Sequence, residues 1–198
     1  AKNGSFLIEE KLIGEEFSIH TITDGINSSH TFPIKDYKRL LNNNKGCNTG
    51  SMGCISGNLH FLTENDISIA KKINQEILKI LQNYYNDNNA YKGILYGSFI
   101  KTVKNDIKII EYNSRFGDPE VVPIVTLLQT DLHTIFKSIV TQTLHTITIK
   151  YDTTNSLTRY IVPVNYAMGK TESSKLFIPK NDTNLYFGDI RFYKYNYY

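Results

Sequence analysis

The chain has 198 residues, a formal net charge of +3 and 40% hydrophobic residues. These values predict a globular protein with one good-sized domain, or with one domain and a small appendage. They exclude a Lys/Arg-rich tail for nucleic acid, and no apolar run approaches the roughly 18–20 residues of a membrane-spanning helix. Cys47 and Cys54 lack partners at zinc spacing, so we expect reduced thiols in a cytoplasmic compartment. The start at Ala1 rather than Met, without a leader, suggests a processed chain or a piece of a longer one.

Two strands are predicted near the start of the chain. Ser5–Glu9 is apolar and β-prone, and Glu16–Thr23 alternates before a turn at Asp24–Gly25, so we expect antiparallel neighbours joined through Gly14. The link between these strands is rich in carboxylates. Such charges commonly solvate a strand edge. The functional alternative is a hinge whose backbone meets a planar base while a carboxylate accepts hydrogen bonds from ribose hydroxyls.

A basic step and a polar loop follow. The step is Asp36–Arg39 (DYKR), and the segment Asn42–Gly57 after it is rich in Asn and Gly, with Asn48–Gly53 (NTGSMG) inside it. This composition is typical of a plain loop. The alternative is an anion site, in which backbone N–H groups of the loop and the two cations of the basic step hold a phosphate.

The middle of the chain predicts a helix and then a strand pair. Apolar residues recur at three- and four-residue steps over residues 66–83, and Thr63 or Asn65 can cap this amphipathic helix. Tyr91–Thr102 and Asp106–Tyr112 predict two antiparallel strands joined by a tight turn. The helix is expected to pack on the sheet.

The second of these strands ends in Glu111–Glu120 (EYNSRFGDPE). Glu111 and Asn113 stand two apart on an extended strand, so both oxygen-bearing side chains leave the same face. Mg²⁺ binds such oxygens and commonly takes one or two carboxylates plus substrate phosphates. Arg115, on that face, could reach an oxyanion next to the metal. The alternative is the solvated face of a half-buried strand.

The last third of the chain is less regular. Val121–Leu128 is ambiguous between a buried strand and a helix, and a further helix is expected over residues 131–144, capped by its first residue, Asp131. Thr146–Tyr151 and Arg159–Val164 predict strands of a small β unit. The stretch Asn184–Tyr198 is dense in aromatic residues, which either pack as a strand or stack on bases. The buried face of the helix is expected to be Leu132, Ile135, Phe136 and Ile139.

The expected architecture is therefore α+β. An antiparallel sheet is drawn from residues 5–113, and the helices 66–83 and 131–144 are expected on one face of it. A small β unit follows after residue 145.

Taken in order, the motifs resemble the phosphoribosylamine–glycine ligases (glycinamide ribonucleotide synthetases) of purine biosynthesis, members of the ATP-grasp superfamily. The matching pieces are Ile8–Glu16 (IEEKLIGEE), Thr23–Gly25 (TDG), Asp36–Arg39 (DYKR), Asn48–Gly53 (NTGSMG), Gly93–Tyr96 (GILY), Glu111–Glu120 (EYNSRFGDPE) and Asp131–Leu132 (DL). The match is strong over residues 5–140, a span too long and too ordered for chance. It implies that residues 1–145 are the carboxy-terminal half of an ATP-grasp domain and that residues 146–198 are a small β-rich carboxy-terminal domain.

The resemblance also implies a reaction. ATP phosphorylates the carboxylate of glycine, and the amine of 5-phosphoribosylamine displaces phosphate to give glycinamide ribonucleotide, ADP and phosphate. Such chemistry needs positioning and charge neutralisation rather than a protein nucleophile. The implied roles are Mg²⁺ or Mn²⁺ binding by Glu111 and Asn113, steadying of the transferred phosphoryl group by Arg115, nucleotide binding by Glu9, Glu10, Leu12 and Glu16, and substrate binding by Asp36, Lys38, Arg39, Asn48, Thr49, Asp118 and Glu120.

Some positions depart from the family's pattern. The family usually has His at Tyr37, Pro at Cys47 and Gly at Ser51, and Ser51 restricts backbone angles that Gly would allow. The family also carries, upstream, an amino-terminal domain and the first half of the ATP-grasp. These parts are expected in the same longer chain or in a separate subunit.

Two other functions stay open. A non-catalytic ATP-grasp remnant that acts as a nucleotide-binding or interaction module is motivated by the truncated start and the Tyr-rich tail. A single-strand nucleic-acid binder that uses this tail is the third hypothesis. The ligase hypothesis predicts ATP, glycine and 5-phosphoribosylamine as partners, with no nucleic acid and no membrane.

Overall fold

The computed structural model describes residues 6–85, 90–167, 169, 175–178, 184–188, 190–193 and 196–197. The chain divides into two compact units, Ala1–Arg159 and Tyr160–Tyr198. Among the described residues, no helix combines the length and the apolar character needed to cross a membrane. The functional residues predicted from the sequence all fall in the first unit.

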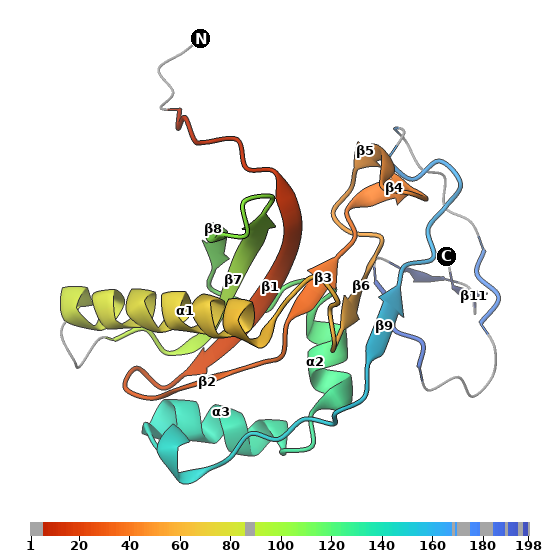
Figure 1. Ribbon diagram of the computed structural model, residues 1–198. Coiled ribbons are helices and arrows are strands. Elements are labelled where there is room, and N and C mark those ends of the chain that lie inside the picture. The colour runs from red at the N-terminus through yellow and green to blue at the C-terminus, as the bar shows by residue number, and fades with distance from the viewer. Residues whose placement is uncertain are drawn as a thin grey trace. The chain divides into compact units, whose positions relative to one another are not determined.

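An antiparallel sheet of seven strands forms the centre of the first unit (Figure 1). Its order is β8-β7-β1-β3-β6-β9, and β2 pairs with β1 beside β3. The central pair, β1 and β7, is in register from Gly14↔Thr102 to Thr23↔Gly93. The strands are β1 (Gly14–Thr23), β2 (Ser28–His30), β3 (Ile34–Asp36), β6 (Gly53–Ser56), β7 (Gly93–Thr102), β8 (Ile107–Asn113) and β9 (Ser156–Arg159). The prediction of an α+β fold around an antiparallel sheet is confirmed.

The helices cover opposite faces of this sheet. Successive side chains of β1 point to alternate faces, so Phe17 and Ile19 face α1 (Glu64–Tyr85), which crosses the sheet in Figure 1. Ile22 faces the other way and packs against α3 (Leu132–Thr141). The prediction that both helices share one face is therefore wrong.

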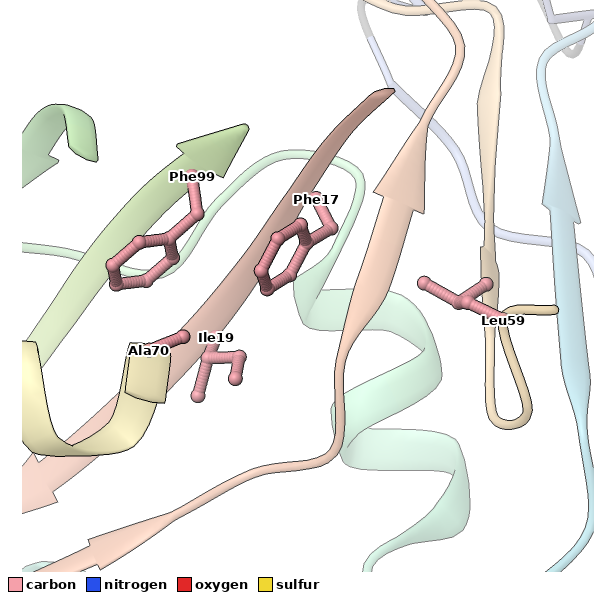
Figure 2. Packing of buried hydrophobic residues seen from close by; sticks show 5 residues of the cluster. All are labelled: Phe17, Ile19, Leu59, Ala70 and Phe99. Carbon is pink, nitrogen blue, oxygen red and sulfur yellow. The ribbon is translucent and has the colours of Figure 1, made fainter. Parts of the chain in front are cut away.

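The core on the α1 side is built around two stacked aromatic rings. Phe17 and Phe99, from neighbouring strands, have ring centroids 5.5 Å apart, and Ala70 of α1 closes over them (Figure 2). Burying such a side chain contributes roughly 1.5–3 kcal/mol. Ile19 and Leu59 complete the buried part of this cluster.

Helix α1 begins with reciprocal capping. The Oγ1 of Thr63 accepts the Asp66 backbone N–H at 3.2 Å, and the Oδ2 of Asp66 accepts the Thr63 backbone N–H at 2.8 Å. The Nζ of Lys101 on β7 donates to the same Asp66 oxygen at 2.8 Å. Of the two predicted caps, Thr63 is the one used, and the cap also ties the helix to the sheet.

The predicted first strand, Ser5–Glu9, is wrong over its described part. Residues 6–13 form no strand, and Phe6, Leu7 and Ile8 are 85%, 80% and 83% exposed. The reason is competition for strand edges: β7 pairs with one edge of β1, and β2 and β3 pair with the other. Local β propensity cannot reveal that both edges are taken.

The segment expected as a plain loop contains a hairpin. Strands β4 (Arg39–Leu41) and β5 (Lys45–Asn48) pair through Arg39↔Asn48 and Leu41↔Lys45. Asn43 and Asn44 close it with positive φ of 57° each, a conformation that Asn adopts more readily than most residues. The Asn-rich composition therefore marks a turn between strands.

Two short helices follow β8. The ambiguous run 121–128 forms the helix α2 (Val121–Leu127), with Pro123 in the first turn, where its missing N–H is tolerated. Asp131 caps α3 as predicted, its Oδ2 accepting the Thr134 backbone N–H at 2.7 Å. Helix α3 ends earlier than predicted because Gln142 is left-handed, and the short helix η2 (Leu144–Thr146) follows. Phe136, expected on the buried face, is 44% exposed.

The predicted strands after residue 145 are shifted. Within 146–151 only Tyr151 forms a bridge, to Leu128, and the strand predicted over 159–164 is instead Ser156–Arg159. The predicted domain boundary after residue 145 lies inside the first compact unit, because β9 pairs with β6. In the second unit, β10 (Phe192–Tyr193) and β11 (Asn196–Tyr197) form an antiparallel pair. The assignment of domains to the two parts stays a prediction.

Candidate active site

A β-bulge in β8 brings the predicted metal ligands to one side of the sheet. Phe99 pairs with Ile109 but Ser98 pairs with Glu111, so Ile110 is an extra residue. Ile109 packs into the cluster under α1. Because the bulge shifts the alternation by one, Glu111 lies on the opposite face from Ile109, beside Ser98.

Glu111 and Asn113 do share a face, as the sequence predicts. The Nδ2 of Asn113 donates to the Oε1 of Glu111 at 3.1 Å, and both side chains reach solvent. One carboxylate and one amide oxygen fit a Mg²⁺ ion that takes its other ligands from phosphates and water. Within the described residues, no group of three or more His, Cys, Asp or Glu side chains could hold a metal alone. The donor set therefore fits a metal that arrives with a phosphate-bearing substrate.

Next to this pair lies a small hollow on the same face of the sheet. It is lined by residues of β1, β3 and β7, of the link between β3 and β4, and by the residue before α2: Glu16, Phe17, Ser18, Asp36, Lys38, Tyr96, Ser98 and Glu120. Glu120 is buried and bonds the hydroxyl of Tyr96. Burial and the Glu120 charge raise the pKa of Tyr96, so this hydroxyl stays protonated and can donate. Four predicted site residues, Glu16, Asp36, Lys38 and Glu120, thus meet in one place.

Asp36 is the carboxyl group with the most unusual environment in this hollow. Burial raises its pKa to about 6, and the nearby Glu120 charge adds to the effect. The hydroxyl of Ser51 opposes the shift by donating to the Oδ1 of Asp36 at 2.6 Å. Two carboxylates so close together favour a cationic ligand, because a bound ammonium group would offset their repulsion.

Ser51 is a supporting residue that the sequence does not reveal. Its Oγ donates to Asp36 and accepts the backbone N–H of Gly53 at 2.9 Å, and its side chain is buried. Ser51 does not adopt a positive φ, so the expected backbone restriction has no consequence here. A Gly at this position could not make the bond to Asp36.

The basic step and the polar loop after it are tied to each other. The backbone N–H and the Oγ1 of Thr49 both donate to the Lys38 carbonyl, at 2.7 and 2.8 Å, and the Met52 N–H donates to the Tyr37 carbonyl. These two N–H groups are therefore not directed at an anion, which argues against the alternative of a backbone anion site. The Nζ of Lys38 lies 3.4 Å from the Oε2 of Glu16, and Arg39 donates to the Gly46 carbonyl. Asn48 is exposed on β5.

Three of the predicted nucleotide-binding residues lie outside the hollow. Glu9, Glu10 and Leu12 belong to the segment before β1. The Oε2 of Glu10 lies 2.6 Å from the Nζ of Lys108 on β8, and this hydrogen bond lowers the pKa of Glu10. Leu12 is half-buried and Glu9 is exposed. Only Glu16, at the start of β1, reaches the hollow.

The loop from β8 to α2 carries the last three predicted residues. Arg115 is exposed and donates to the Phe116 carbonyl at 2.8 Å, Asp118 is exposed, and Glu120 is buried. Gly117 permits this arrangement, because a Cβ there would lie 2.5 Å from the Oε2 of Glu120. The bond between Asp118 and Pro119 is cis.

A buried histidine supports this loop. The backbone N–H of Gly117 donates to the Nε2 of His20 on β1 at 2.9 Å. Burial, and then the charge of Arg115, lower the pKa of His20 to about 3, so the ring is neutral. In the sequence, His20 is recognisable only as part of the predicted strand Glu16–Thr23. Its one local signal is a polar residue within an alternating β run.

Comparisons with known proteins identify the family to which the chain is similar. The family model "Phosphoribosylglycinamide synthetase, ATP-grasp (A) domain" matches residues 1–121. The chain is 39% identical over 166 residues to a phosphoribosylamine–glycine ligase of Methanocaldococcus jannaschii, covering 82% of this chain and 36% of that protein. It is 32% identical over 193 residues to the Methanosarcina acetivorans ligase, covering 96% of this chain and 43% of that protein.

A solved structure of a phosphoribosylamine–glycine ligase is also similar to this chain. The crystal structure of phosphoribosylamine–glycine ligase from Thermotoga maritima matches with a TM-score of 0.73 at 26% identity, over 96% of this chain and 46% of that one. The chain thus spans less than half the length of each of these three proteins.

Proposed function

Because the chain belongs to the phosphoribosylglycinamide synthetase family and carries its ATP-grasp fold, we propose that it forms the carboxy-terminal part of the active site of a phosphoribosylamine–glycine ligase. The observation that carries this proposal is the placement of Glu111 and Asn113 beside the hollow that holds Glu16, Asp36 and Glu120. Metal ligands and substrate-binding carboxylates then lie on one face of one sheet. The remainder of the ligase would come from the same longer chain or from a separate subunit.

In the proposed reaction, a carboxylate oxygen of glycine attacks the γ-phosphorus of ATP, and ADP leaves. The amine of 5-phosphoribosylamine then attacks the carbonyl carbon of glycyl phosphate, phosphate leaves, and the amine loses a proton as the amide forms. Phosphoryl transfer of this kind depends on positioning and on neutralising charge. A Mg²⁺ or Mn²⁺ ion held by Glu111 and Asn113 would supply much of that neutralisation.

The proposed role of each side chain follows from its charge and its position. Arg115, exposed on the loop next to the metal ligands, would steady the transferred phosphoryl group. Glu9, Glu10 and Leu12 would meet the adenine, and Glu16 the ribose hydroxyls. Substrate binding falls to Asp36, Lys38, Arg39, Asn48, Thr49, Asp118 and Glu120.

The buried carboxylates of this set suggest a more specific role. Burial, and to a smaller extent the charge of Glu120, raise the pKa of Asp36, and the nearby charge of Lys38 only partly opposes the rise. The ammonium group of glycine, or the amine of phosphoribosylamine, would supply a further compensating cation. Lys38 would instead attract the phosphate of the substrate once its contact with Glu16 opens.

Metal-dependent nucleotide binding tests the proposal on the chain itself. We expect weak binding of ATP that requires Mg²⁺ or Mn²⁺, measurable by titration calorimetry. Glu111→Gln should weaken it by roughly tenfold or more, the scale found even for residues that support metal ligands. The matched control is Glu76→Gln, an exposed carboxylate on α1. A Glu111→Gln chain that kept all metal-dependent binding would contradict the site.

Catalysis is tested by supplying the amino-terminal part of a ligase of this family to the chain. Formation of glycinamide ribonucleotide that stops in the Glu111→Gln variant is the expected result. It would also exclude the alternative of a non-catalytic remnant. Nucleotide binding without any activity in the complemented protein would favour that alternative.

A further inference from the structure

His20 occupies the centre of β1 and is fully buried. Its ring lies between two aromatic side chains, with centroids 4.9 Å from Tyr96 and 5.8 Å from Phe116. Its Nε2 accepts the backbone N–H of Gly117, 97 residues away in the sequence. The side chain therefore joins the central strand to the loop between β8 and α2.

This hydrogen bond fixes the protonation of the ring. Because Nε2 is the acceptor, the proton of the neutral imidazole must be on Nδ1. Among the described residues, the buried Nδ1 has no hydrogen-bond partner. A buried polar group without a partner is costly, so packing alone would be served better by an apolar side chain such as Leu. A histidine at this position is accounted for by the hydrogen bond that Nε2 accepts from the Gly117 N–H, which Leu could not accept.

Gly117 is the point at which the loop is fixed on both sides. Its N–H is held by His20, and its carbonyl accepts the N–H of Val121 at the start of α2, at 2.9 Å. A Cβ at Gly117 would collide with Glu120 and with Tyr96. The backbone at this residue therefore determines where the neighbouring functional side chains lie.

We propose that His20 is a positioning residue of the active site: its Nε2 lone pair holds the Gly117 N–H and thereby sets the positions of Arg115 and Glu120. This inference rests on the proposed function, since those two side chains are assigned there to the phosphoryl group and the substrate. His20 itself does not touch the substrate. It acts through the loop.

The hydrogen bond can be observed directly by NMR on the 198-residue chain labelled with ¹⁵N. An N–H···N bond gives a scalar coupling between the two nitrogens, so we expect a coupling between the Gly117 amide and His20 Nε2. The imidazole ¹⁵N shifts should show Nδ1 protonated and Nε2 unprotonated. A protonated Nε2, or no coupling in a folded chain, would overturn the proposal.

Two substitutions separate positioning from packing. His20→Leu keeps an apolar volume but removes the acceptor, and His20→Gln restores an acceptor oxygen. We expect His20→Leu to speed Gly117 amide exchange and to weaken Mn²⁺–ATP binding by roughly tenfold, as for other residues that support a binding group. His20→Gln should restore both. Equal Mn²⁺–ATP binding by wild type and a folded His20→Leu chain would overturn the proposal.

Matched controls keep each outcome decisive. His30→Leu removes another histidine, which is half-buried and whose Nδ1 bonds the Oγ1 of Thr21, and it should leave Mn²⁺–ATP binding unchanged. If His20→Leu does not fold, His20→Gln decides: loss of Gly117 protection and of nucleotide binding in that variant would overturn the proposal. If wild type binds no Mn²⁺–ATP, the proposed function fails. The NMR coupling still tests whether His20 accepts the hydrogen bond from Gly117.

Discussion

Asp36 should make the protein less stable at neutral pH than an uncharged residue would. Its pKa is raised from 3.8 to about 6, by burial and by the charge of Glu120. The folded state therefore holds a proton that the unfolded state has already lost between these two values. By linkage, Asp36 costs no stability below about pH 4, costs progressively more as pH rises to about 6, and reaches a constant cost above that.

The size of this effect follows from the two pKa values. At 1.36 kcal/mol per unit, the change from 3.8 to about 6 sets an upper limit near 3 kcal/mol, and solvent screening of this half-buried carboxyl reduces it to about 2 kcal/mol. The Asp36→Asn chain keeps an acceptor for Ser51 but carries no charge. It should match wild type at pH 4 and exceed its stability by about 2 kcal/mol at pH 7.5.

Urea unfolding of both chains between pH 4 and pH 8 measures this difference, and the comparison cancels the titration of other groups. Asp106→Asn, at an exposed carboxylate in the turn before β8, is the control and should give a small difference at every pH. An NMR titration of the Asp36 carboxyl should give a pKa near 6. Ser51→Ala should raise it further, by about one unit. A stability difference between Asp36→Asn and wild type that does not change with pH would refute this account of the hollow.

Two further predictions concern close packing and capping. Gly117→Ala should destabilise the protein by about 1–3 kcal/mol, because the new methyl group meets Glu120 and Tyr96. Chemical denaturation measures this loss, with Gly50→Ala as the control because nothing lies within 4 Å of a Cβ there. Equal losses of stability in the two variants would contradict the prediction. Asp66→Ala removes both the cap contact with Thr63 and the contact with Lys101, so a loss of about 2 kcal/mol is expected. Glu64→Ala, in the same first turn, should change stability by less than about 0.5 kcal/mol, and an equal loss in both would argue against the cap.

The parts of the fold that the sequence predicts are those with local causes. The alternation in β1, the turn between β7 and β8, the cap at Thr63 and the cap at Asp131 each depend on residues a few positions apart. The strand expected over residues 5–9 fails because its place is taken by strands from elsewhere in the chain. The faces covered by the two helices also depend on packing between distant segments.

The candidate site divides in the same way. The shared face of Glu111 and Asn113 follows from their spacing and is found in the structure. The support of Asp36 by Ser51 spans 15 residues, and that of Gly117 by His20 spans 97. No periodicity relates such pairs. Neither supporting role could therefore be identified before the chain was folded, although Ser51 lies inside the motif Asn48–Gly53.

The bulge at Ile110 allows one strand to serve two different environments. Before it, β8 places Ile107 and Ile109 against the apolar layer under α1. After it, Glu111 of the same odd-numbered series is exposed and charged, and Asn113 is polar and partly exposed. A regular strand could change environment in this way only by burying Glu111 or exposing Ile109. The extra residue reverses which face the following odd-numbered side chains point to. One end of the strand therefore packs in the core, and the other end presents the proposed metal ligands to solvent.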